Sequence, residues 1–182
     1  MKKSLLQIIM ILSFAFLLCF AISCQQQGEE TAAGEELKAK VRQEIDEAWN
    51  MGNVDVLDEL YSADMVYHIP PYPDIVGLEA YKQFIEENHT AYPDLKLTII
   101  EIITEGDTVA TRWTYDGTQE GPSPTLGIPA TGKHVIFSGC VVAHQVDGKT
   151  VEAWNHVDWV GLLTQLGFTL TPPQLPAPQE KE

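Results

Sequence analysis

The sequence predicts an α+β domain in which a cone-shaped, curved antiparallel sheet packs against three N-terminal helices and encloses a pocket. Two observations predict this class. Apolar residues at helical spacing fill the first half of the domain. Long β-branched and aromatic runs, separated by turn residues, fill the second half. Helices followed by antiparallel strands are typical of α+β domains whose helices cover one face of the sheet.

The helical half divides at glycine and proline. The first helix is indicated by five apolar residues at helical spacing: Leu37, Val41, Ile45, Ala48 and Trp49. Gly52-Asn53 ends it, and residues 54–61 continue as a second, short helix. Residues 65–69 form a brief strand that Pro70-Pro71 stops. A third helix follows Gly77.

The strand half contains four runs, over residues 95–103, 109–118, 134–146 and 150–160. The turns between them are marked by Glu105-Gly106-Asp107, by the proline-containing loop 121–132, and by Asp147-Gly148. Antiparallel neighbours joined in this way would curl over the helices and leave a cavity beneath the sheet.

The two ends of the chain lack the helix and strand patterns of the domain. Lys2 and Lys3 precede an apolar run and then small residues before Cys24, which is the layout of an export signal. The segment resembles a bacterial lipoprotein signal, in which Cys24 would carry the lipid; an uncleaved membrane anchor or an ordinary signal is the alternative. We therefore expect a signal over 1–23, a lipidated tether over 24–34, the domain over 35–170 and a disordered tail over 171–182. Either reading places the domain outside the cytoplasm, at the bacterial cell envelope.

Composition excludes several classes of function. The net charge is −15, which argues against binding to nucleic acid. Cys140 is the one cysteine within the domain, and a small buried hydrophobe is a more common role for it than a nucleophile. The five histidines form no pair at metal-ligand spacing, and no phosphate-binding loop occurs, so we expect neither metal nor cofactor.

Seven short segments together resemble the SnoaL-like polyketide cyclase family. They are Met51–Asp55, Leu60–Asp64, Tyr92–Leu95, Leu126–Lys133, Phe137–Gly139, Asp147–Lys149 and Gly161–Gly167. They occur in order and span nearly all of residues 35–167. The resemblance implies the nuclear transport factor 2-like fold, which agrees with the cone predicted above.

The resemblance also implies a catalytic residue that this chain lacks. Characterised members close a ring in a polyketide ester, and their acid/base Asp matches Asn155 here. Asn has no titratable proton near neutral pH, but it can donate a hydrogen bond to an enolate oxygen. Positions where the cyclases carry His and Gln fall at Val141 and Gly139. The Arg and Asp of related epoxide hydrolases fall near Trp113 and Tyr115.

The turn at Asp147-Gly148 decides which side chains face the pocket. A three-residue bulged loop would pair Gln145 with Lys149, and Asn155 with Gly139. It predicts one apolar pocket face, made of Phe137, Val141, Ala153 and Val157 around Asn155. A two-residue turn is the alternative and would place Asn155 beside Cys140.

Further pocket residues come from other strands. Trp113 and Tyr115 share a parity and are expected to line the cavity, with the Tyr hydroxyl as a polar group. Alternation sends either Tyr67 or His68 inward, and a pocket His68 could act as acid or base.

The opposite face of the sheet would carry His134, Cys140, His144, Trp154, His156 and Asp158. A bulky aromatic such as Trp154 on an outer face predicts a homodimer through that face. Covering of Trp154 by loops or by the C-terminal turn is the alternative.

The leading hypothesis is a protein that binds a small, mostly apolar carbonyl compound. If it is an enzyme, it would perform proton transfer of the cyclase or isomerase kind with Asn155, His68 and Tyr115 as polar groups. The alternative is a non-catalytic, lipid-anchored binding or assembly module of the cell envelope.

Overall fold

The computed structural model describes residues 32–123 and 125–171 of the 182-residue chain. The expected signal, Cys24 and residues 172–182 lie outside the described residues. Within the described ranges, no helix has both the length and the apolar character needed to cross a membrane.

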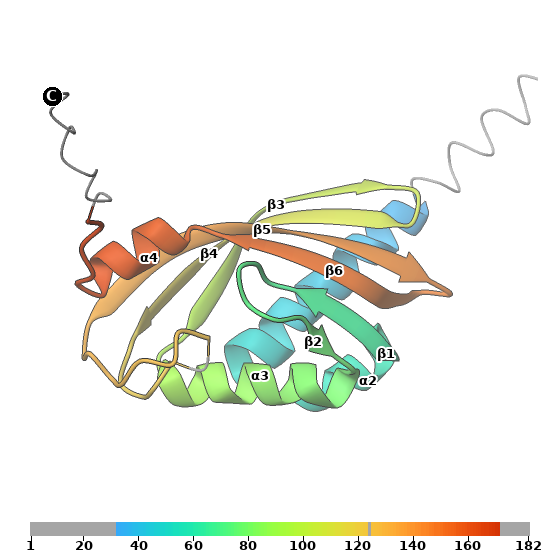
Figure 1. Cartoon of the computed structure of the whole chain (residues 1–182). Coiled ribbons are helices and arrows are strands. Elements are labelled where there is room, and N and C mark those ends of the chain that lie inside the picture. Colours follow the sequence, from blue (N-terminus) through green and yellow to red (C-terminus); the bar gives the residue numbers. More distant parts are fainter. Residues whose placement is uncertain (1–31, 124, 172–182) are drawn as a thin grey trace, which may run out of the picture.

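Four helical regions follow the predicted order, with one addition at the end (Figure 1). The first helix is already formed at residue 32, so residues 32–34 of the expected tether belong to it. It changes to π-helical geometry in η1 (Glu44–Asn50) and ends near Gly52, whose φ of 74° suits glycine. Then come η2 (Val54–Val56) with α2 (Leu57–Leu60), α3 (Leu78–Ala91) and the added helix α4 (Trp159–Gln165).

One six-stranded sheet has the order β2-β1-β6-β5-β4-β3. The strands are β1 (Tyr61–His68), β2 (Ile75–Val76), β3 (Lys96–Glu105), β4 (Thr108–Thr118), β5 (His134–Val146) and β6 (Lys149–Val157). The predicted antiparallel sheet needs one correction, because β1 pairs with β6 in parallel. The chain passes from β1 through α3 and the whole β3–β5 meander before it returns as β6, so β1 and β6 run in the same direction.

The turn between β5 and β6 corrects the predicted register. It is a two-residue turn with Asp147 at φ 50° and Gly148 at φ 77°, and Val146 pairs with Lys149. A bulge follows, because Gln145 pairs with Thr150 whereas His144 pairs with Glu152. The turn and the bulge together shift the register by two, so Asn155 opposes Val141, not Gly139 or Cys140. A shift of two leaves every side chain on its face, and the predicted facing is therefore correct although the partners are not.

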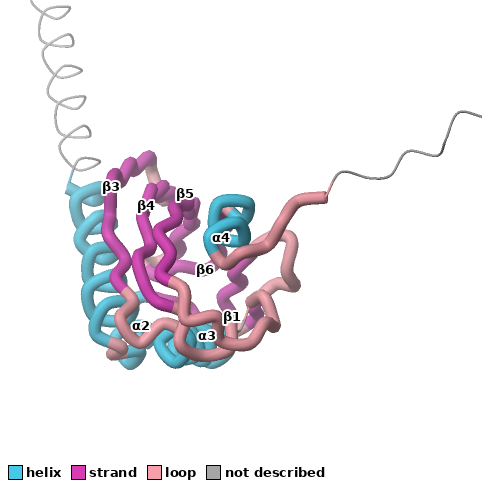
Figure 2. The backbone as a smooth tube through the Cα atoms, turned by 90° about the vertical axis from the view of Figure 1, so that its left-hand side faces the viewer, coloured by secondary structure: helices cyan, strands magenta, loops and turns pink. Residues whose placement is uncertain are grey.

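The core lies between the helices and the concave face of the sheet. Figures 1 and 2 show the strands curving over α3, with the first helix along the same side. The predicted apolar positions of the first helix are all buried: Leu37, Val41, Ile45, Ala48 and Trp49. The last four of these residues belong to one core cluster with the inward-facing side chains of the sheet, as the amphipathic pattern predicts.

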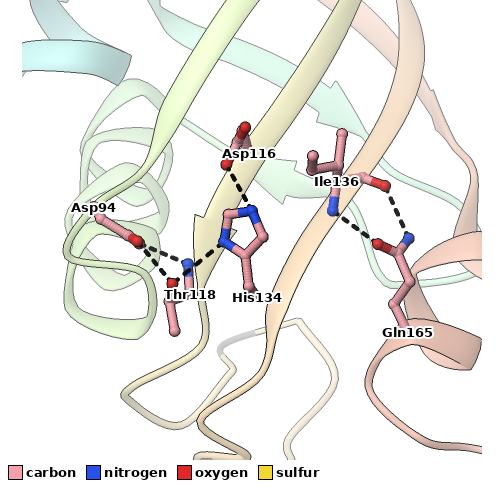
Figure 3. Close-up of polar contacts among 6 residues, drawn as sticks. All are labelled: Asp94, Asp116, Thr118, His134, Ile136 and Gln165. Atoms are coloured by element: carbon pink, nitrogen blue, oxygen red, sulfur yellow. Dashed lines mark hydrogen bonds and ion pairs between the residues drawn. The ribbon is translucent and has the colours of Figure 1, made fainter.

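Helix α4 is fastened to the part of β5 that extends beyond the end of β6. There the Gln165 side chain accepts a hydrogen bond from the backbone N–H of Ile136 at 2.8 Å and donates one to its carbonyl at 2.8 Å (Figure 3). The amide thus replaces a neighbouring strand at an edge that would otherwise be unpaired. Figure 3 also shows Thr118 of β4 bonded to Asp94, and His134 paired with Asp116 at 3.3 Å.

Candidate functional site

A cavity of about 100 Å³ lies between the helices and the inner face of the sheet. Its lining is mostly apolar and aromatic, drawn from the first helix, α3, α4 and the strands β1 and β3 to β6. An apolar cavity of about 150 Å³ can hold benzene, so this space is of the order that a small organic molecule or fragment requires. Leu162 of α4 lines the cavity, which explains why the attachment of α4 to β5 matters for the site.

Most of the residues expected in the pocket line it. Asn155 and Tyr115 line it, and Tyr67, Trp113, Phe137, Val141 and Val157 complete this set. Ala153 is on the same face but is covered by neighbours, at 1% exposed, and does not line the cavity. Of the two alternatives on β1, Tyr67 is the inward residue.

His68 points to the other face of the sheet, so its expected place in the pocket is corrected. Its Nδ1 lies 2.8 Å from Asp74 and its Nε2 lies 2.9 Å from Glu152. The Glu152 hydrogen bond, followed by that of Asp74, raises the pKa of His68. Because side chains alternate along a strand, an inward Tyr67 requires an outward His68.

The predicted outer face carries the aromatic residue expected there, but it is partly covered. Trp154 stacks on the His68 ring with centroids 5.1 Å apart and meets the edge of His144 at 5.3 Å. Asp158 accepts a hydrogen bond from the backbone of Gly161 at 2.9 Å and begins α4, which is a structural role. Within residues 32–123 and 125–171, no group of three or more metal-ligand side chains occurs.

Some buried polar side-chain atoms of residues that line the cavity have no hydrogen-bond partner among the described residues. They include the Asn155 Oδ1, the Tyr115 hydroxyl, the Thr111 hydroxyl and the Gln145 Oε1. Thr111 and Asn155 lie on one cross-strand row, since Val141 pairs with both. A buried polar atom without a hydrogen bond costs about 1–3 kcal/mol, so a bound molecule or water that reached these atoms would be favoured.

At positions 139 and 141, where the family resemblance implies polar side chains, this chain has Gly139 and Val141. Gly139 lies on the inner face beside Trp113, and a Cβ at position 139 would meet the Trp113 indole ring and the His156 carbonyl. The space that a Gln side chain would take in the cyclases is therefore occupied by Trp113. Val141 opposes Asn155 and presents an apolar surface.

Glu44 is a cavity residue that the sequence analysis missed. It lines the cavity from the first helix, and the Tyr81 hydroxyl of α3 donates a hydrogen bond to its Oε1 at 2.9 Å. Burial raises the pKa of Glu44, against the opposing hydrogen bonds of Tyr61, Tyr81 and Trp49. A signal was present in the sequence: Glu44 lies seven residues after Leu37, and therefore on the apolar stripe of the helix.

The tyrosines around Glu44 share its environment. Burial is the main cause that raises the pKa of Tyr61, Tyr67 and Tyr81, and the charge of Glu44 adds to it. The Asn155 side chain acts on Tyr67 in the opposite direction through a hydrogen bond. These hydroxyls therefore remain protonated and can donate hydrogen bonds at all physiological pH values.

Comparison with known proteins gives one family. The family described as SnoaL-like polyketide cyclase matches residues 39–166. No match was found among curated proteins.

Solved structures share the fold. TsrD from Streptomyces laurentii is 28% identical with a TM-score of 0.66, over 73% of this chain and 96% of its own. AclR from Streptomyces galilaeus, for which a hydroxylase activity is proposed, is 30% identical with a TM-score of 0.61, over 71% and 94%. IdmH from Streptomyces antibioticus, for which a polyketide cyclase activity is proposed, is 28% identical with a TM-score of 0.58, over 72% and 98%. The order of elements, the cavity and these matches agree, and the chain belongs to the SnoaL-like polyketide cyclase family.

Proposed function

We propose that the cavity binds a small, mostly apolar carbonyl compound and that the protein performs proton transfer of the cyclase or isomerase kind on it. One observation carries the proposal: residues that line an apolar cavity, Asn155 and Tyr115 among them, have buried polar atoms without a hydrogen-bond partner among the described residues. Ligand sites commonly combine an apolar lining with a small number of polar groups that fix orientation.

Asn155 offers both kinds of hydrogen-bonding group to a ligand. Its NH2 group can donate to a carbonyl or enolate oxygen, its unpartnered Oδ1 can accept from a ligand hydroxyl, and the residue is only 6% exposed. The Tyr115 ring packs against Tyr92 and Phe137, and its buried hydroxyl is a second donor. Neither group is a base near neutral pH, so both would position and polarise the ligand.

A thermal-shift screen with polyketide-like esters, steroids and terpenoids tests the binding. A ligand at 100 times its dissociation constant stabilises a protein by about 2.7 kcal/mol, which such a screen detects. Among the ligands that bind, carbonyl compounds should bind Asn155→Leu with about tenfold lower affinity, because one hydrogen bond to a buried group is lost. His156→Leu on the same strand is the matched control, since His156 is exposed on the outer face. A screen without a ligand, or equal affinities in both variants, would contradict the proposal.

We propose also that the protein is held at the bacterial cell envelope by a lipid on Cys24. Support comes from the sequence alone, in the order Lys2-Lys3, apolar run, small residues and cysteine. Mass spectrometry of the full-length protein from cells should find a diacylglycerol adduct that Cys24→Ala abolishes. An unmodified Cys24 in the wild-type protein would exclude the anchor.

The homodimer through the outer face remains a prediction, with weaker support than the sequence suggested. Trp154 is covered in part by His68 and His144, so it is not a free aromatic surface. Sedimentation velocity should show a dimer for the wild-type domain and a monomer for Trp154→Asp. A monomeric wild-type protein would contradict it.

A further inference from the structure

Two charged side chains line the cavity among the described residues, and both come from the first helix. Lys40 is engaged elsewhere, because its Nζ lies 2.9 Å from the Gly148 carbonyl and 3.0 Å from Glu36. Glu44 is thus the carboxyl group that the described part of the chain presents to the cavity. The other lining residues are neutral near pH 7.

Glu44 is oriented by a hydrogen bond from another helix. The Tyr81 hydroxyl of α3 donates to it at 2.9 Å, and Tyr61 of β1 and Trp49 of the same helix also act to lower its pKa. The rings of Tyr61 and Tyr67 pack on Tyr81 with centroids 5.2 Å and 4.8 Å away. A carboxyl group that accepts a hydrogen bond from a tyrosine packed in this way is oriented, which general acid/base catalysis requires.

The tyrosines connect Glu44 with Asn155 across the cavity. The charge of Glu44 raises the pKa of Tyr67, and a hydrogen bond with the Asn155 side chain lowers it, so Tyr67 lies near both residues. The two ends of this group have complementary chemistry: a carboxyl that can take a proton and an amide that can donate to an oxygen. A carbonyl compound bound between them would have its oxygen at Asn155 and a neighbouring carbon towards Glu44.

We propose that Glu44 is the acid/base residue of the cavity and takes over the proton transfer that the family resemblance assigned to the position of Asn155. This inference rests on the proposed function. The Glu44 carboxylate removes a proton from the carbon next to the carbonyl group. The C–H electron pair becomes the C=C bond, and the carbonyl π pair moves to the oxygen, which the Asn155 NH2 group stabilises as an enolate. Glu44 then returns the same proton to the product, so no further reactant is needed.

Burial strengthens Glu44 as a base. Burial outweighs the hydrogen bonds that oppose it, and the pKa of Glu44 is raised. A base is most effective when its pKa approaches the working pH, and a desolvated carboxylate is a stronger base than an exposed one. The backbone also changes from α- to π-helical geometry at Glu44, a feature often found at functional sites.

The test uses 5-nitrobenzisoxazole, a small apolar probe of carboxylate bases. A base takes its C3 proton, the C–H pair forms a nitrile, and the N–O bond breaks to release a coloured phenolate. We expect the purified domain to accelerate this reaction, and Glu44→Gln to lower kcat/KM by about 100-fold or more. Glu86→Gln is the matched control, since Glu86 is exposed on α3. Tyr81→Phe should move the pH midpoint of the remaining activity upward, because a hydrogen bond that lowers the pKa of Glu44 is lost.

The second measurement needs no ligand. Carbon NMR of the side-chain carboxyls should show one glutamate that titrates above the others and is absent in Glu44→Gln. Turnover that survives Glu44→Gln, bound probe without turnover, or an ordinary Glu44 titration would each overturn the assignment. If no compound binds while Glu44 titrates at a raised pKa, the assignment of Glu44 as the cavity's proton carrier is supported and the ligand class of the proposed function is wrong.

Discussion

Tyr67 and His68 are neighbours on β1, and they belong to two regions with opposite electrostatics. Tyr67 faces the cavity beside Glu44, where burial removes water from a carboxyl group. His68 faces outward between Asp74 and Glu152, where two carboxylates accompany a ring that solvent still reaches. The pKa of Glu44 and the pKa of His68 are both raised, the first by burial and the second by hydrogen bonding to Glu152 and Asp74. In the cavity the fold disfavours the charged carboxylate of Glu44, whereas on the outer face it favours the charged imidazolium of His68.

Both raised pKa values mean that the folded state holds its proton more tightly than the unfolded chain. The contribution of Glu44 to stability is complete below its ordinary pKa of 4.5 and is lost as the pH rises through its raised value in the fold. The contribution of His68 is complete below 6.5 and is lost as the pH rises through its own raised value. The stability contribution of Glu44 begins to fall with rising pH at a lower pH than that of His68, whose contribution falls only as the pH rises above 6.5.

The largest expected difference between the two faces is one of packing. Trp113 is buried on the inner face against Phe137, so Trp113→Ala should cost about 3–5 kcal/mol of unfolding free energy. Trp154→Ala on the outer face should cost less than half of that, because Trp154 is only partly covered. Urea denaturation of both variants measures the two losses. Equal losses would show that the outer face is covered by more than His68 and His144.

A smaller effect is expected from one methyl group on the inner face. Gly139→Ala adds a Cβ that would meet the Trp113 ring and the His156 backbone, and overpacking of this kind costs about 1–3 kcal/mol. Gly106→Ala is a control for glycine in open space, although its φ of 54° adds backbone strain. The double variant Gly139→Ala/Trp113→Phe should recover part of the loss. Failure to recover would mean that the backbone of His156, and not Trp113, sets the limit.

The effect of the Glu44 carboxyl on stability should depend on pH. Glu44→Gln removes a group whose ionisation is disfavoured by burial, so the variant should gain melting temperature over the wild type at pH 8 and lose this advantage at pH 4. Differential scanning calorimetry across this range checks it. A gain that does not depend on pH would mean that packing and not charge distinguishes Glu from Gln here.

Much of the inner face could be predicted from the sequence because alternation and family motifs constrain it together. The apolar spacing of the first helix gave its buried residues, and alternation along β4 to β6 gave Trp113, Tyr115 and Asn155. The bulge after Thr150 could not be predicted, because a single extra residue there is marked by no glycine or proline in the sequence of β6.

The site itself was only partly predictable. Glu44 was missed because one charged residue on an apolar helix stripe usually snorkels to solvent, and only the positions of α3 and β1 show that tyrosines surround it. His68 could not be assigned to a face, because the phase of a short strand depends on its parallel partner β6, which lies about 80 residues further along the chain.

The smallest effect is expected at the outer histidine. His68→Gln keeps a hydrogen-bonding side chain but removes the positive charge that Glu152 and Asp74 favour. Because the ion pairs are exposed, the loss of unfolding free energy at pH 5 should be about 1 kcal/mol or less. It should fade as the pH rises through the folded-state pKa of His68, and added salt should reduce it at pH 5. His156→Gln, an exposed histidine on the same face, is the matched control. A loss at His68 that is the same at pH 5 and at pH 9 would show that stacking on Trp154, rather than charge, is what His68 contributes, and the contrast between the two faces would then be one of packing alone.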